Sequence, residues 1–250
     1  MRRNLLLSIS ITLTSLLFLL VVQQAALAGP PLVCHPFEIG NARSLPWSAS
    51  QWRAVDKNYD INRLVEDTVG LLTPQTPVLV RMETLRRATI YAVWSMYDRE
   101  VGYPVKDARV ANALLSRLKA RVSDPGVKSD KKATALALFD YGYLAESYKQ
   151  AGDGSKGVDL ASGVDGYALI VKAIAIGGGD PQMEFAAALA SSDRPRGAHS
   201  SLRDAHLAHL RRAVAGAQEG SLLARNLITH FSNMGKTIGE LRASVATARN

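Results

Sequence analysis

The pair Cys34-His35 is the first place in this sequence where the residue types could do chemistry. A thiol beside an imidazole can act as a nucleophile of low pKa, as a pair of metal ligands or as a redox sensor. Cys34 is also the single cysteine of the chain, so it cannot close an internal disulfide and could instead join two chains in a dimer. The default interpretation is that Cys34 fills a small apolar site with His35 on the surface, because most buried cysteines are inert.

A second candidate is the pair His206 and His209. Their i, i+3 spacing places both side chains on one side of a helix, where they could hold a transition metal with His199 or His230. No cysteine or carboxylate joins them at the spacing of a metal ligand set. We therefore expect hydrogen-bonded core histidines at these two positions, with metal binding as the alternative and no cofactor.

Charged residues interrupt an otherwise apolar helical pattern at Glu83, Arg86 and Arg87, and again at Asp140. Charges on a buried helix must be paired or hydrated, so the spacing predicts a structural ion pair between Glu83 and Arg87. The alternative is a polar pocket that binds an anionic ligand. Glu83 and Asp140 would serve as an acid–base pair only if both carboxylates shared one cleft.

The positive charge of the chain is concentrated near its C-terminal end. Residues 29–193 hold 19 basic and 19 acidic side chains, whereas residues 194–250 hold nine basic and three acidic ones. Arg211, Arg212 and Arg225 are the candidates for contact with an anionic component of the cell envelope, and a solvated face is the alternative. Nucleic acid is disfavoured, because Phe231 is the only aromatic residue after position 193.

The first 28 residues have the features of a cleaved signal peptide. Arg2 and Arg3 precede an apolar run over residues 5–22, and Ala26-Leu27-Ala28 has the small-x-small form that a signal peptidase cuts. No basic stop-transfer flank and no cysteine follow the cut directly, and no later segment is long and apolar enough to span a bilayer. We expect an exported bacterial protein, periplasmic or secreted.

The remaining chain divides into three parts. Residues 29–49 contain four prolines and are expected to form an irregular N-terminal arm. Residues 50–193 should form a helical body, and residues 194–250 a basic helical hairpin docked on that body. Alternating β-branched runs are missing, so the predicted fold is all-α, with antiparallel helical hairpins stacked as a solenoid or an irregular bundle. The expected helices cover about 60–72, 76–97, 105–122, 130–151, 160–176, 181–190, 200–217 and a segment that begins at 221.

Within the body, residues 144–153 read LAESYKQAGD. This segment resembles the end of the first helix of a tetratricopeptide repeat, where a tyrosine and then Gly-Asp close the helix before an antiparallel second one. The second helix, expected over 160–176 and ending near Asp180-Pro181, is similar to the close of that repeat. The resemblance covers about one unit, residues 133–181, and implies a concave surface for a peptide or protein partner.

The common catalytic signatures are missing from the sequence. It contains no Gly-x-Ser-x-Gly, no His-Glu-x-x-His, no Cys-x-x-Cys and no phosphate-binding glycine-rich loop that ends in Lys-Ser or Lys-Thr. We therefore predict a non-enzymatic module that binds a protein, a peptide or an anionic envelope component. The alternative is a small exported enzyme or a thiol- or metal-binding protein that uses Cys34-His35 or His206 and His209.

Overall fold

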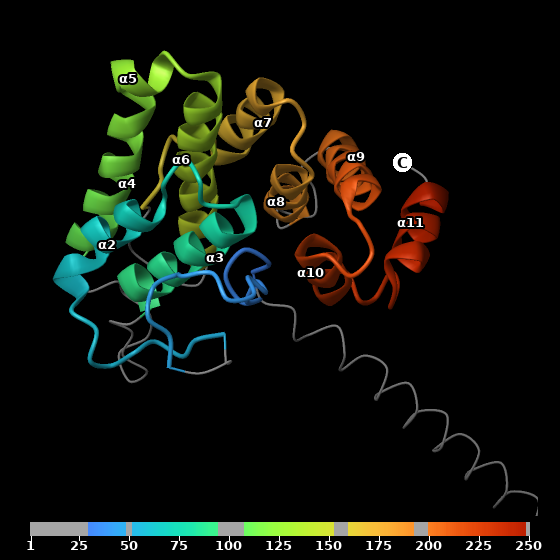
Figure 1. Cartoon of the computed structure of the whole chain (residues 1–250), viewed down its shortest axis with the longest axis horizontal. Helices are drawn as coiled ribbons and strands as arrows, with labels where there is room; N and C mark the ends of the chain where they lie inside the picture. Colours follow the sequence, from blue (N-terminus) through green and yellow to red (C-terminus); the bar gives the residue numbers. More distant parts are fainter. Residues whose placement is uncertain (1–29, 49–51, 95–107, 153–159, 193–199, 249–250) are drawn as a thin grey trace, which may run out of the picture.

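The computed structural model describes residues 30–48, 52–94, 108–152, 160–192 and 200–248 (Figure 1). All regular secondary structure in these ranges is helical, which confirms the predicted all-α class. The elements are a short 3-10 turn (Ile61–Arg63), α2 (Leu64–Leu71), α3 (Val78–Thr89) with a π-helical turn (Ile90–Trp94), α4 (Arg109–Ser123), α5 (Pro125–Lys128), α6 (Lys131–Gly152), α7 (Gly166–Gly177), α8 (Pro181–Ser192), α9 (Ser200–Gly216), α10 (Leu222–His230) and α11 (Ile238–Thr247). The expected signal peptide lies outside the described residues. Among the described helices, none has both the length and the apolar composition needed to cross a bilayer.

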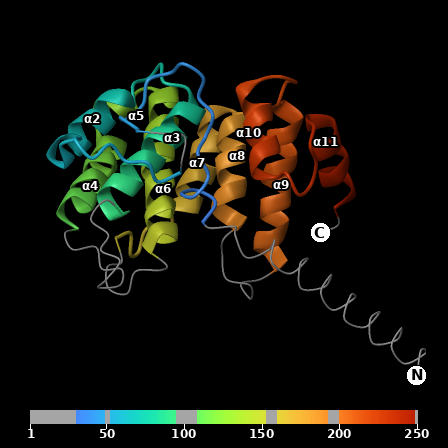
Figure 2. The same ribbon diagram turned by 90° about the horizontal axis from the view of Figure 1, so that it is seen from below.

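The helices pack mainly against their neighbours in sequence. Figure 2 shows α4, α6, α7, α8, α9 and α11 side by side in a row, and the corresponding pairs are in contact. Helix α3 packs on α6 and α8 and forms part of a second layer. A single apolar core runs through this arrangement, since all the longer helices contribute buried hydrophobic residues to one cluster.

Two glycines allow helices α6 and α7 to approach closely. A Cβ atom on Gly142 would lie 2.6 Å from the backbone oxygen of Gly166, and a Cβ on Gly166 would collide with the oxygen of Gly142. Neither helix could keep this position with an alanine at the contact. The two glycines therefore fix the hairpin formed by α6 and α7.

Most helix ends follow local chemistry that is visible in the sequence. Asp165 and Ser221 cap α7 and α10 by accepting hydrogen bonds from backbone N–H groups, and Gly178 ends α7 in the left-handed conformation. The expected start of α7 near 160 is wrong, because the chain turns through Gly163 and the helix begins only after the Asp165 cap. Thr76 does not cap α3; its hydroxyl donates instead to the Leu71 carbonyl.

The arm, residues 30–48, is irregular as predicted and belongs to the core. It lies between α3 and α10 in both views (blue in Figures 1 and 2). Five of its apolar side chains are buried, namely Leu32, Val33, Phe37, Ile39 and Leu45. The arm thus joins the body to the C-terminal helices, although none of residues 30–48 is helical.

The C-terminal part consists of three helices rather than the expected two. The segment after Ser221 forms α10, turns over residues 231–237 and continues as α11, which Thr237 caps. Helix α9 packs against α8 and α11, so this part is docked on the body through α8.

Candidate functional site

Polar side chains of several helices form hydrogen bonds with the main chain of the arm. We call this set of side chains the arm cradle. Its members are Glu83, Arg86 and Arg87 of α3, Gln150 of α6 and Asn226 of α10. The Gln150 side-chain oxygen accepts a hydrogen bond from Leu32 N–H at 2.8 Å. The Asn226 amide pairs with both main-chain groups of one residue, accepting from Glu38 N–H at 2.8 Å and donating to the Glu38 carbonyl at 2.9 Å. These contacts are made with main-chain groups of the arm, in a turn at Leu32 and outside regular secondary structure at Glu38, rather than with particular side chains.

Glu83 is the centre of the cradle. One of its oxygens accepts from Phe37 N–H at 3.0 Å and from Arg86 Nε at 2.7 Å. The other accepts from Arg87 Nε at 2.7 Å and from Arg86 Nη2 at 2.9 Å. The ion pair expected between Glu83 and Arg87 is therefore present, within a larger group that includes fully buried Arg86.

The two arginines also donate to arm carbonyls and pack on an aromatic ring. Arg86 donates to the Val33 carbonyl at 3.1 Å, and Arg87 donates to the Leu45 carbonyl at 2.6 Å. Both guanidinium groups lie over the Trp47 ring, at 5.1 and 5.4 Å from its centre. The hydrogen-bonding groups that could have clamped an anionic ligand are thus directed at the protein's own arm.

Three buried polar atoms of α6 lie beside this network: Tyr143 Oη, Ser147 Oγ and Gln150 Nε2. Each lacks a hydrogen-bond partner within the part of the chain that the structure describes. The i, i+4, i+7 spacing places them on one face of α6. Burial and the nearby Glu83 carboxylate raise the pKa of Tyr143 well above its ordinary value, so its hydroxyl stays neutral and can donate. This face of α6 therefore has unused hydrogen-bonding capacity next to the arm.

Asp140 belongs to a different network from Glu83. Arg81 donates to it at 2.6 Å and also donates to the carbonyls of Thr73 and Thr76, while Arg121 lies 3.7 Å away. Burial raises the pKa of Asp140 to about 6, although Arg81 and Arg121 oppose that shift. The two carboxylates share no partner, so the geometry does not bring them together as an acid–base pair.

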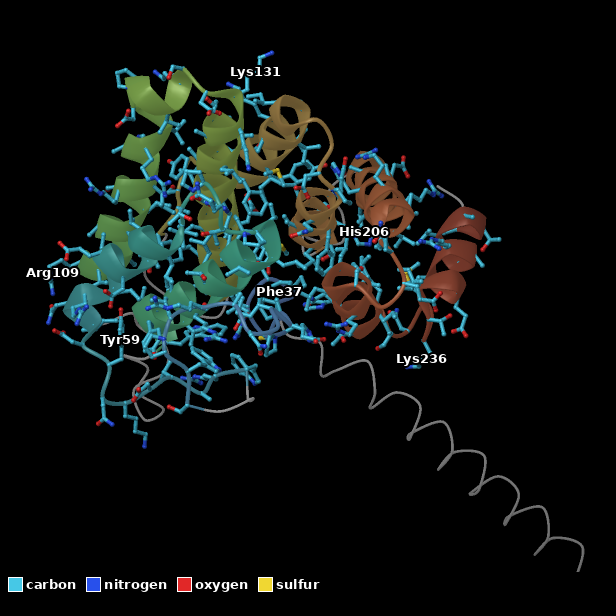
Figure 3. The ribbon with its side chains drawn as sticks, in the orientation of Figure 1. Phe37, Tyr59, Arg109, Lys131, His206 and Lys236 are labelled. Carbon is cyan, nitrogen blue, oxygen red and sulfur yellow. The ribbon has the colours of Figure 1, made fainter. Side chains whose placement is uncertain are left out.

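The Cys34-His35 pair lies on the arm near α10. Cys34 is half-buried. His35 is half-buried too, rather than on the surface, because the arm turns at Pro30 and directs its ring toward His230, at 5.6 Å between centres. His230 stacks on Phe37 at 4.8 Å, and Figure 3 shows Phe37 in the middle of the molecule. Burial lowers the pKa of His230 to about 4.

His206 and His209 both face α8 but make separate contacts. His206 Nδ1 bonds to the Ala188 carbonyl at 2.8 Å, and Figure 3 shows His206 between α8 and α9. His209 lies between Glu184 and Tyr167, with Nδ1 2.5 Å from Glu184 and Nε2 2.9 Å from the Tyr167 hydroxyl. No group of three metal-binding side chains is found among the described residues, and His199 lies outside them. Both histidines are hydrogen-bonded against the core, as the default interpretation expected.

The arginines expected to form a basic surface all make contacts inside the protein. Arg211 donates to the carbonyls of Val245 and Ala248 at the end of α11, at 2.8 and 2.5 Å. Arg212 binds Glu184 at 2.6 Å, and Arg225 binds Glu38 at 2.8 Å. The side chains of Arg212 and Arg225 remain about half exposed.

Sequence reasoning did not find Gln150, Asn226, Glu184 or Tyr167 as site residues. Gln150 and Asn226 bond to arm residues 118 and 188 positions away, so no local pattern could reveal them. Glu184 was visible only as the single charge of α8, between Met183 and Phe185.

Comparisons with known proteins return nothing for this chain: no protein-family model, no curated protein and no solved structure matches it. The contacts described above are therefore the basis for the functional argument.

Proposed function

We propose that this chain is an exported, non-enzymatic interaction module that binds an extended polypeptide segment in the arm cradle. The observation that carries the proposal is the pair of hydrogen bonds between the Asn226 amide and both main-chain groups of Glu38. Such a contact depends on an extended backbone and tolerates many side chains. The protein's own arm occupies the cradle, and a partner segment would compete with it.

The arrangement of the helices supports this proposal. The cradle is built from α3, α6 and α10, while α8 contributes Phe185, whose ring meets Phe37 edge to face at 5.9 Å. An extended segment lying across successive helical hairpins is the binding mode that the tetratricopeptide-like stretch implies. The polar face of α6, with Tyr143 and Ser147, offers further hydrogen bonds to a bound backbone.

The charges favour a polypeptide over an anionic envelope component. Arg211, Arg212 and Arg225 all have intramolecular acceptors. Binding an anion through them would require breaking those contacts. Binding a polypeptide in the cradle does not leave the cradle side chains without partners, because one extended segment can replace another there.

The test is competition between the arm and a free peptide. Phe37→Ala in the full mature chain loosens the arm without changing a cradle residue, since it removes the stacking on His230 and Phe185. A fluorescent peptide with the sequence of residues 30–48 is then titrated and followed by anisotropy. We expect the loosened chain to bind this peptide at least about tenfold more tightly than the unaltered chain does, because a truncated buried Phe costs about 3–5 kcal/mol.

The controls are a scrambled peptide of the same composition and Asn226→Ala in the loosened chain. Loss of the two main-chain hydrogen bonds should weaken peptide binding by about 1–3 kcal/mol. If Phe37→Ala prevents folding, Ile39→Ala loosens the arm at another buried position. A folded, loosened chain that binds the arm peptide no better than the scrambled one would contradict the proposal.

A further inference from the structure

Three consecutive helices bring a carboxylate, an imidazole and a hydroxyl into one hydrogen-bonded line. Glu184 on α8 lies 2.5 Å from His209 Nδ1, and the Tyr167 hydroxyl on α7 lies 2.9 Å from His209 Nε2. The exposed fractions of Glu184 and His209 are 3% and 5%, whereas Tyr167 is half-buried. The line therefore joins a buried acid, a buried imidazole and the hydroxyl of a half-buried tyrosine.

The partners of Glu184 determine which nitrogen of His209 carries the proton. Arg212 Nε donates to Glu184 at 2.6 Å, in a charge-assisted hydrogen bond between a guanidinium and a carboxylate. An ionised carboxylate can only accept, so the short contact requires the proton on His209 Nδ1. Arg212 Nη2 also lies 2.8 Å from Nδ1, but it cannot donate to a nitrogen that already carries hydrogen. In the neutral imidazole, Nε2 is then the acceptor for the Tyr167 hydroxyl.

We propose that Tyr167, His209 and Glu184 form a nucleophilic site in which Tyr167 accepts an acyl group from an activated ester. The arrangement has the polarity that such a reaction needs, because the base faces the hydroxyl and an acid on its far side orients the base. This site lies on α7, α8 and α9 and does not involve the arm cradle. The proposal is therefore independent of peptide binding.

The step balances without an oxidant or a metal. The Tyr167 oxygen attacks the carbonyl carbon of the ester while its proton passes to His209 Nε2. The bond from that carbon to the leaving alcohol then breaks, and Nε2 returns the proton to the departing oxygen. The products are an acyl ester of Tyr167 and a free alcohol, and Glu184 stabilises the imidazolium that exists between the two proton transfers.

Two residues of the same chain show what an ordinary structural contact looks like. Tyr59 is also half-buried, but its hydroxyl donates directly to Asp67 at 2.8 Å, and this carboxylate together with burial raises the pKa of the phenol. His206 lies one turn from His209 on α9, and its Nδ1 bonds to a backbone carbonyl. Tyr59 and His206 are therefore matched controls for Tyr167 and His209.

The experiment exposes the full mature chain to p-nitrophenyl acetate and follows release of nitrophenolate between about pH 5 and pH 8. Peptide mass spectrometry then locates the acetyl groups that hydroxylamine removes. We expect acetylation of Tyr167 to exceed that of Tyr59 by at least about tenfold, since general-base assistance contributes about 10²–10⁴-fold. Because His209 takes the proton from the hydroxyl, acetylation of Tyr167 should proceed well below the pKa of about 10 of an ordinary phenol.

Variants separate catalysis from packing. His209→Gln should slow acetylation of Tyr167 by at least about tenfold, whereas His206→Gln should leave it within about twofold. Circular dichroism checks the fold of each variant, and Glu184→Gln replaces His209→Gln if the latter does not fold. Equal acetylation of Tyr167 and Tyr59 would overturn the proposal. So would acetylation of Tyr167 that is unchanged in a folded His209→Gln or Glu184→Gln variant.

Discussion

Glu83 and Glu184 are both buried glutamates between basic partners, yet their surroundings differ in kind. Each oxygen of Glu83 accepts two hydrogen bonds, and the surrounding donors also hold main-chain groups of the arm. Glu184 holds one half-exposed arginine and one imidazole, whose second nitrogen faces a hydroxyl. A carboxylate whose oxygens accept all their hydrogen bonds from arginines and backbone N–H groups stabilises the fold. A carboxylate that orients an imidazole leaves the second nitrogen of that ring able to exchange a proton with the hydroxyl.

The strongest test of this difference is removal of each charge in turn. Glu83→Gln leaves buried Arg86 without its ionic partner and should lower the free energy of unfolding by about 3–5 kcal/mol. Glu184→Gln leaves Arg212, which is half exposed and can be hydrated, so we expect a smaller loss of about 1–2 kcal/mol. Urea unfolding followed by circular dichroism measures both.

Glu66→Gln on α2 is the control for these two variants, because Glu66 is exposed and should change the stability by less than about 0.5 kcal/mol. Equal losses for Glu83→Gln and Glu184→Gln would remove the distinction between the two regions.

A second test uses acid, to which two buried groups respond in opposite directions. The pKa of His230 falls from 6.5 to about 4 in the folded protein, so between these values the unfolded chain binds a proton that the folded chain does not. Acidification through this window therefore favours unfolding through His230, by up to about 3 kcal/mol. The pKa of Asp140 rises from 3.8 to about 6, so below pH 6 the folded chain takes up the proton first and acidification favours folding.

Single variants separate the two effects. His230→Phe retains a ring on Phe37, and we expect it to gain stability relative to the unaltered chain as the pH falls from about 6.5 to about 4. Asp140→Asn should lose relative stability between about pH 6 and pH 4. Urea unfolding at several pH values measures both slopes. A His230→Phe difference that does not change with pH would show that acid does not destabilise the fold through this histidine.

The helices were largely predictable from sequence, whereas the partners of the charged residues were not. The expected helix at 130–151 is α6, Lys131–Gly152, because its apolar periodicity and its ends are local properties. The ion pair of Glu83 with Arg87 was also local, at i, i+4. The contact of Glu83 with Phe37 spans 46 positions and that of His209 with Glu184 spans 25, and such pairings depend on how whole helices pack.

The smallest effect we predict concerns the basic C-terminal helices. Arg211 on α9 donates to carbonyls at the end of α11, and Arg242 on α11 donates to the carbonyls of Val214 and Ala217 at the end of α9. Helix C-termini carry partial negative charge and unpaired carbonyls, so each of these two ends is stabilised by an arginine from the neighbouring helix. The excess of arginine in this part of the chain thus has a structural use.

Arg211→Met and Arg242→Met should each lower the free energy of unfolding by about 1 kcal/mol, because each removes a charge from a helix C-terminus and leaves two carbonyls without their donor. Arg225→Met is the matched control, since its ion pair with Glu38 is about half exposed on both sides and should contribute less than about 0.5 kcal/mol. The measurement is urea unfolding at low and high salt. Equal losses for all three variants would mean that these arginines act as general surface charge. The basic C-terminal helices would then be better explained as a surface for a partner than as a set of helix caps.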